Sequence, residues 1–143
     1  MFQRIMVPID LAHIDQLSRP LQVAADAARH YAAEVWYVAV TSDAPGSVAR
    51  TPQEYQRKLD GFVAEQSTLH DQPTHGRVII SPDPVADLDD TLVNAIKDLG
   101  ADLVVMGTHL PRHLDAVMPS HGGKVATHTK ASVFLVRPQE LSR

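Results

Sequence analysis

Short, continuous apolar segments alternate with longer amphipathic ones along the chain. Five apolar segments are rich in β-branched residues and predict buried strands, at residues 4–10, 34–40, 76–81, 102–106 and 132–137. Between them, apolar residues recur every three or four positions, which predicts helices over residues 15–32, 55–69 and 88–99. Gly100 follows the last of these helices and is expected to end it as a C-cap.

The order of these elements predicts the fold. Residues 41–53 and 82–84 carry the Pro, Gly, Ser and Asp of exposed turns, and a loop with a further helix precedes the last strand. Uninterrupted apolar strands that alternate with helices predict a doubly wound, Rossmann-like α/β fold, with a five-stranded parallel sheet flanked by helices. No repeat or linker divides the chain, so we expect a single domain over residues 1–143.

Composition narrows the function classes. The 143 residues are 44% hydrophobic, enough for one core, and the formal net charge of -4 offers no basic excess for nucleic acid or an anionic membrane. No cysteine occurs, which excludes disulfides, thiolate catalysis and Cys-based zinc sites. No secretion signal or apolar stretch of ~20 residues is present, so we expect a cytoplasmic protein without membrane insertion.

The predicted fold directs attention to the carboxyl ends of the strands. Ligands of open parallel sheets bind there, where the winding direction reverses. The candidate positions are Pro8 to Asp10, Val40 to Thr41, Ser81 to Asp83, and Gly107 onward. Asp10 could accept a hydrogen bond from a ribose or an adenine amine, or it could cap the turn that follows it.

The segment after Gly107 has some features of a phosphate-binding loop. Ser120 is a candidate N-cap, Gly122 and Gly123 leave backbone amides unobstructed, and Lys124 adds positive charge. Neither a Walker loop nor a dinucleotide fingerprint is present. The glycines could equally serve only to turn the chain between a strand and a helix.

Three segments together resemble the universal stress protein family, of the small single-domain kind. They are "RIMVPID" at the start, "LGADLVVMGTH" before the loop, and "KVATHTKASVFLVR" at the end. The resemblance covers nearly the whole chain. It implies a five-stranded parallel sheet and a stress-response sensor or regulator that acts through a protein partner still to be identified. It also implies a homodimer that pairs through the edge strand from Ser132 to Arg137.

The family divides into members that bind ATP and members that do not. Binders resemble the pattern Gly-x-x-Gly, nine residues, then Gly-Ser/Thr. Here Gly107 matches the first glycine, Leu110 replaces the second, and Pro119 replaces the third after only eight residues, with Ser120 as the hydroxyl. Proline has no amide donor, and leucine restricts close backbone approach. A shortened-loop branch, which "THLPRHLDAVMPS" resembles, nevertheless includes members that bind ATP.

The resemblance implies that the ligand is ATP or another adenine nucleotide, with or without Mg²⁺. We identify no general base, so slow ATP hydrolysis is the most that we expect, and no residue is assigned a catalytic role. The residues implied to contact the nucleotide are Pro8, Ile9, Asp10, Val40, Met106, Gly107, His109, Ser120, His121 and Gly122.

Two other functions stay open. Leu110 and Pro119 favour a nucleotide-independent, homodimeric interaction module. The histidines, with His109 and His113 four residues apart, raise the third hypothesis of a metal-dependent enzyme, although Pro111 between them argues against a regular helix. We assign no metal ligand. Four further histidines are interpreted as surface residues: His13, His30, His70 and His75.

Overall fold

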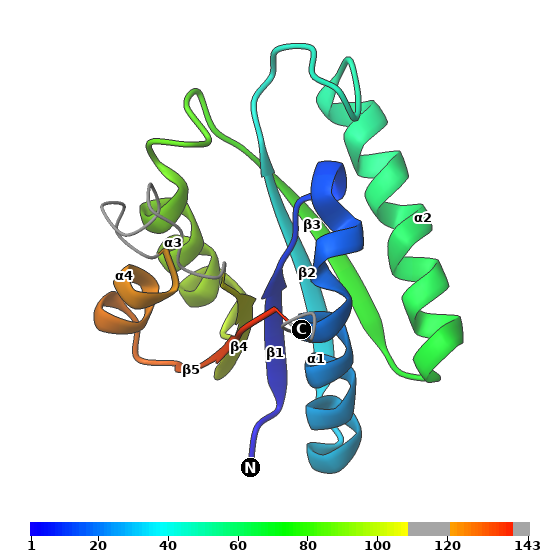
Figure 1. Cartoon of the computed structure of the whole chain (residues 1–143), viewed down its shortest axis with the longest axis vertical. Helices are drawn as coiled ribbons and strands as arrows, with labels where there is room; N and C mark the ends of the chain where they lie inside the picture. The colour runs from blue at the N-terminus through cyan, green and yellow to red at the C-terminus, as the bar shows by residue number, and fades with distance from the viewer. Residues whose placement is uncertain (109–120, 139–143) are drawn as a thin grey trace, which may run out of the picture.

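The computed structural model describes residues 1–108 and 121–138. Its five strands form one parallel sheet in the order β3-β2-β1-β4-β5, which confirms the predicted fold class (Figure 1). The elements are β1 (Arg4–Pro8), a 3₁₀ segment η1 (Leu11–Leu17), α1 (Ser18–Tyr31), β2 (Glu34–Thr41), α2 (Pro52–His70), β3 (Thr74–Ile80), α3 (Leu88–Leu99), β4 (Leu103–Gly107), α4 (His121–His128) and β5 (Ser132–Val136).

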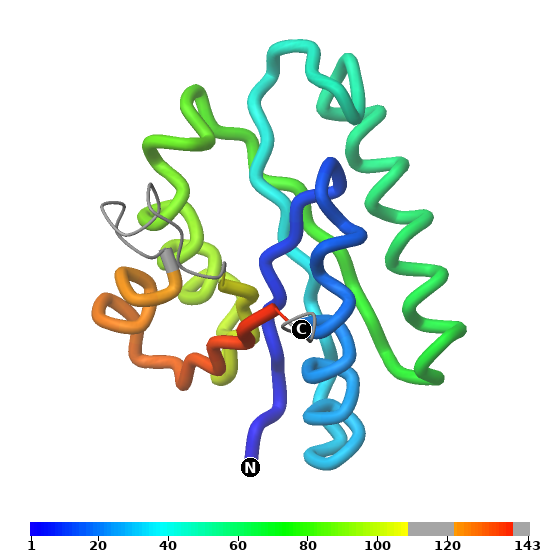
Figure 2. The backbone as a smooth tube through the Cα atoms, viewed as in Figure 1, coloured from blue at the N-terminus to red at the C-terminus, as the bar shows by residue number. Residues whose placement is uncertain are grey.

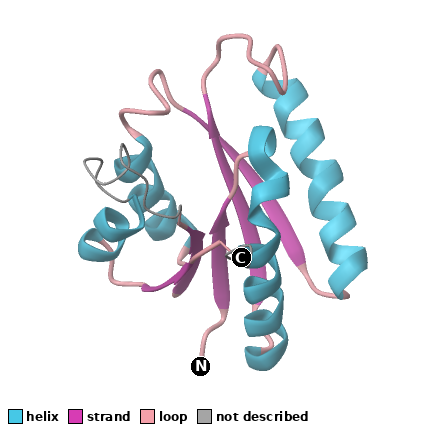
Figure 3. Ribbon diagram, viewed as in Figure 1, coloured by secondary structure: helices cyan, strands magenta, loops and turns pink. Residues whose placement is uncertain are grey.

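The helices form a layer on each face of the sheet (Figure 3). Helices α1 and α2 cover one face, and α3 and α4 cover the other. In β1, Ile5 and Val7 pack into the core beneath α1 and α2, whereas Met6 packs into the core beneath α3 and α4. Strands β2 and β4 repeat this alternation. Both faces of the central strands are therefore buried, which explains their continuous apolar sequences.

The two edge strands are less covered than the central ones. Strand β3 pairs only with β2, and β5 pairs only with β4. On β5, Phe134 and Leu135 are 49% and 41% exposed, and on β3 Ile80 is 55% exposed. The helices flank both faces of the sheet, as predicted, and cover the central strands more completely than these edge residues.

The helix ends follow local signals that the sequence predicted in part. Thr51 caps α2 by accepting a hydrogen bond from the Glu54 amide at 3.1 Å. Gly100 ends α3 in the left-handed conformation, as predicted, and Ala32 and Asp71 end α1 and α2 in the same conformation. The helix predicted over residues 15–32 is interrupted at its start, because residues 11–17 form the 3₁₀ segment η1 before regular helix begins at Ser18.

The path of the chain creates one reversal of winding (Figure 2). From β1 the chain moves through β2 to the edge strand β3, and then crosses by α3 to β4 on the other side of β1. The reversal therefore lies between the carboxyl ends of β1 and β4, which we call the switch point. None of the helices in the described residues is long and apolar enough to cross a membrane.

Candidate functional site

The switch point brings together three of the four strand ends that the sequence singled out. The fourth, at Ser81 to Asp83, follows the edge strand β3 and lies farther away. Strand β1 pairs with β2 on one side and with β4 on the other. Residues 8–10, Val40, Met106 and Gly107 therefore lie at the carboxyl ends of three neighbouring strands. We call this edge of the sheet the carboxyl rim.

Asp10 is an exposed acidic residue directly after β1, and its carboxylate has two local partners. Oδ1 accepts a hydrogen bond from the Ala12 amide at 3.0 Å, so Asp10 caps η1. Oδ2 lies 2.9 Å from Nδ1 of His13. This hydrogen bond, and then the charge of Asp10, raise the pKa of His13. The Asp10 side chain is still 60% exposed, so the capping role that the sequence left open leaves the carboxylate accessible.

Buried contacts hold this part of the rim in place. The Ile9 amide donates to the Val38 carbonyl at 2.9 Å and extends the ladder between β1 and β2. The Tyr55 hydroxyl on α2 accepts a hydrogen bond from the Leu11 amide at 3.2 Å. Burial raises the pKa of Tyr55, with a further contribution from the charge of Asp10, so this hydroxyl is neutral at physiological pH.

Three of the predicted contact residues belong mainly to the core. Ile9 packs beneath α1 and α2, and Met106 packs on the opposite face, beneath α3 and α4. Each is 6% exposed, and Val40 is partly buried. Because these side chains pack in the core, a ligand at the rim would contact mainly their backbone groups.

The two described glycines of the predicted site both have packing roles. A Cβ added to Gly107 would lie 3.0 Å from Cγ of Pro20 on α1. A Cβ added to Gly122 would overlap the Leu135 side chain on β5. Close packing against the proline ring therefore favours a glycine at position 107. At position 122 the neighbouring atom is the end of the flexible Leu135 side chain, which is 41% exposed and can move, so a ligand contact at Gly122 stays a prediction.

The phosphate half of the predicted site is described only in part. His109 and Ser120 lie outside the described residues, and His121 opens α4. Nζ of Lys124 on α4 lies 3.8 Å from Oδ2 of Asp89 on α3. Lys124 therefore already has a carboxylate partner, with which a phosphate would have to compete.

Sequence reasoning missed a polar cluster at the opposite, amino edge of the sheet. The Glu34 carboxylate accepts hydrogen bonds from Nε1 of Trp36, at 3.0 Å, and from Nε of Arg4, and it lies 3.5 Å from Nε2 of His75. The Trp36 hydrogen bond is the largest cause of the lowered pKa of Glu34. The His75 ring, interpreted from sequence as a surface residue, is 44% exposed and stacks on Trp36 with 4.6 Å between centroids. Glu34 and Trp36 are two residues apart in an otherwise apolar strand, and this spacing could have indicated that their side chains share one face.

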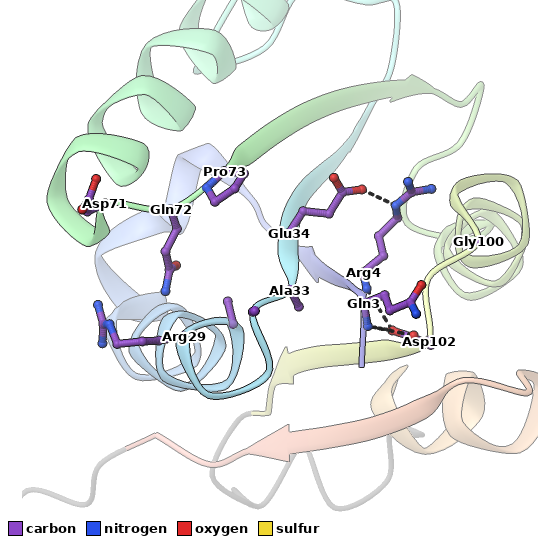
Figure 4. Close-up of a pocket in the computed structure, with 12 residues that line it drawn as sticks. Gln3, Arg4, Arg29, Ala33, Glu34, Asp71, Gln72, Pro73, Gly100 and Asp102 are labelled. Carbon is purple, nitrogen blue, oxygen red and sulfur yellow. Dashed lines mark hydrogen bonds and ion pairs between the residues drawn. The ribbon is translucent and has the colours of Figure 1, made fainter. Parts of the chain in front are cut away.

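A pocket of about 740 Å³ lies at this amino edge (Figure 4). The Asp102 carboxylate, which lines it, accepts hydrogen bonds from the backbone amides of Gln3 at 2.9 Å and Arg4 at 3.1 Å. Arg4 also donates to Glu34 and to the Leu99 carbonyl. These contacts join the starts of β1, β2 and β4, so we interpret the polar side chains here as structural.

The histidine hypothesis concerns residues that are mostly outside the described part of the chain, since His109 and His113 fall there. Within residues 1–108 and 121–138, no group of three His, Asp or Glu side chains is placed to hold a metal ion. His13 was interpreted as a surface residue, and its side chain is 62% exposed. Its three-residue spacing from Asp10 was the signal that could have paired them.

Comparisons with known proteins agree with this fold. A crystal structure of a universal stress protein in complex with cAMP is similar, with a TM-score of 0.71, 18% identity, and coverage of 96% of this chain and 99% of that one. The Archaeoglobus fulgidus universal stress protein in complex with dAMP gives a TM-score of 0.64, 18% identity, and coverage of 94% and 97%. An Arabidopsis thaliana family protein with AMP bound gives 0.61, 14% identity, and coverage of 96% and 92%.

At these identities the structural similarity establishes the fold alone. No curated protein matches the sequence significantly. The sequence itself matches the Universal stress protein family over residues 1–137, nearly its whole length. Together with the parallel sheet and its order of strands, this match shows that the chain belongs to the universal stress protein family.

Proposed function

We propose that this protein binds an adenine nucleotide, ATP or a related one, at the carboxyl rim between β1 and β4. The observation that carries the proposal is an exposed carboxylate, Asp10, at the switch point of a doubly wound sheet, next to the strand that ends in Gly107. The similar structures with bound cAMP, dAMP and AMP support the same ligand class.

The adenosine half of the proposed site has suitable chemistry. An ionised carboxylate has about four acceptor positions, and the described contacts of Asp10 use two of them. Ribose hydroxyls or the adenine amine would donate to the remaining positions. The backbone of Pro8, Ile9 and Val40, on adjacent strands, would line the same region.

In the phosphate half, the amino end of α4 follows the loop after Gly107. Backbone amides at a helix start favour anions. His109, Ser120, His121 and Gly122 stay the predicted contacts there. Mg²⁺, if it accompanies ATP, would be held mainly by the phosphates.

We further propose that the protein is a cytoplasmic sensor or regulator of the stress response. Binding would change the surface that residues 107–123 offer to a protein partner. A change in amide exchange across this segment on addition of nucleotide is the expected result, and an unchanged pattern in a saturated complex would contradict the mechanism.

Titration calorimetry tests the binding proposal. Protein stripped of nucleotide by unfolding and refolding would be titrated with ATP, ADP and AMP, with and without Mg²⁺, and with GTP as the control for base selectivity. We expect saturable heat with the adenine nucleotides. No heat at high micromolar ligand would contradict the proposal and favour the nucleotide-independent module.

An exposed apolar edge supports the proposed homodimer. Phe134 and Leu135 project from β5, an edge strand whose backbone would otherwise remain unpaired on one side. Replacing Phe134 by lysine should shift the protein from dimer to monomer, because a like charge from each copy would meet at the interface. Light scattering after size exclusion measures the mass.

The matched control for this substitution lies on the other edge of the sheet. Ile80 of β3 is 55% exposed, and Ile80→Lys should leave the mass unchanged. A wild-type monomer at all concentrations, or a dimer that survives Phe134→Lys and dissociates with Ile80→Lys, would refute pairing through β5.

A further inference from the structure

His13 lies beside the exposed carboxylate of Asp10, which belongs to the proposed site. It lies in η1, three residues after Asp10, with a non-helical backbone (φ -128°, ψ 30°). Nδ1 is 2.9 Å from Oδ2 of Asp10, and the two side chains are 62% and 60% exposed. The imidazole therefore lies at the carboxyl rim in solvent, where a bound ligand would meet it.

The contact leaves Asp10 able to bind a ligand. The Ala12 amide takes one acceptor position on Oδ1, and the His13 ring N–H takes one on Oδ2. Since each carboxylate oxygen accepts about two hydrogen bonds, one position on each oxygen remains. With one N–H fixed on each oxygen, the carboxylate is oriented, and its remaining positions are available together to paired donors such as ribose hydroxyls.

The charge of His13 matters because a nucleotide is an anion. A lone Asp10 carboxylate would repel the phosphates, and a protonated His13 offsets that charge at contact distance. Asp10 and, more weakly, Asp15 raise the pKa of His13. The charge of Asp10 also contributes to the raised pKa of Tyr55, whose hydroxyl is neutral. The offset is therefore complete at acidic pH and is lost as pH rises through the raised pKa of His13.

We propose that His13 is a positioning residue of the nucleotide site, which orients Asp10 and makes affinity for anionic adenine nucleotides fall as the pH rises. The inference rests on the proposed function, since it assigns the regulation of that same site. It concerns binding only and involves no chemical step.

The test compares AMP affinity in wild type and His13→Gln, by calorimetry from about pH 5.5 to pH 8.5. Glutamine keeps a hydrogen-bond donor and cannot be protonated. We expect wild type to bind AMP about three- to five-fold more tightly than the variant at the acidic end, and the ratio to decrease towards one at the basic end. The AMP phosphate titrates at about pH 6 in both experiments, so the ratio at each pH removes the part of its contribution that does not depend on His13. His30→Gln, an exposed histidine on α1, should match wild type throughout.

The pKa of His13, measured by NMR titration of its imidazole, provides a readout that a purely structural role would not change. Because linkage is reciprocal, saturating AMP should raise the pKa of His13 further, and uncharged adenosine should raise it less. Parallel affinity profiles for wild type and His13→Gln, with no effect of AMP on His13, would overturn the inference and leave nucleotide binding intact. Failure of wild type to bind AMP at any pH would instead overturn the proposed function, and this inference with it.

Discussion

Replacing Gly76 by alanine is expected to lower the free energy of unfolding by about 1–3 kcal/mol, the usual cost of overpacking a core. Gly76 lies in β3, beneath α2. A Cβ at this position would lie 2.7 Å from Cγ2 of Val63 and 3.1 Å from Cγ of Leu59. Neither neighbour can move easily, because Leu59 is fully buried and valine in a helix is nearly restricted to one rotamer. Either α2 must lift from the sheet or β3 must shift.

The matched control is the same substitution on the solvent side of α2. Gly61 is exposed, and a Cβ there would meet nothing within 4 Å. Gly61→Ala should raise stability by about 0.5–1 kcal/mol, because alanine loses less conformational entropy in a helix. Urea unfolding followed by circular dichroism measures both variants. Equal stability of Gly76→Ala and wild type would show that β3 and α2 are packed less closely than described.

Replacing Asp10 by asparagine is expected to weaken adenine-nucleotide binding by about 1–3 kcal/mol, or roughly 5- to 150-fold. The amide oxygen of asparagine can still accept from Ala12, so the cap of η1 is retained. The variant loses the charge and one acceptor oxygen, which removes the charge-assisted hydrogen bonds proposed for the ribose or adenine. Calorimetry with ATP and AMP at fixed pH measures the change.

Asp98→Asn is the control for the loss of one negative charge. Asp98 is an exposed residue near the end of α3, at the amino edge of the sheet. It should bind nucleotide as wild type does. If Asp10→Asn also retained wild-type affinity and melting temperature, Asp10 would be removed from the binding site, and the ligand would have to be sought elsewhere on the rim.

The burial of the central strands could be predicted from the local sequence pattern, whereas the exposure of the edge strands could not. Ile5, Met6 and Val7 are all apolar because successive side chains enter opposite core layers, and that pattern requires helices on both faces. Phe134 and Leu135 are equally apolar in sequence but are partly exposed. The hydrophobicity of a strand does not by itself predict whether a helix covers that strand or whether its side chains stay exposed for contact with another chain.

The candidate site was predictable in position and only partly in chemistry. Strand order and the rule for switch points placed Asp10 and Gly107 on one rim, as observed. The pairing of Lys124 with Asp89 was not predictable, because it depends on how α4 packs against α3, a helix that lies earlier in the chain. Gly122 appeared in sequence as an open amide, and in the structure it also lies against the Leu135 side chain on β5.

By itself, the sequence determined the doubly wound sheet and the rim at which a ligand would bind, because these follow from the period of apolar residues and the order of elements along the chain. The family followed separately, from the match of residues 1–137 to the universal stress protein family. Only the tertiary structure decided which polar groups at that rim remain available. It pairs Asp10 with His13 and Lys124 with Asp89, and it buries Ile9 and Met106. Such pairings depend on distances of a few ångströms between side chains, and spacing along the sequence does not specify those distances.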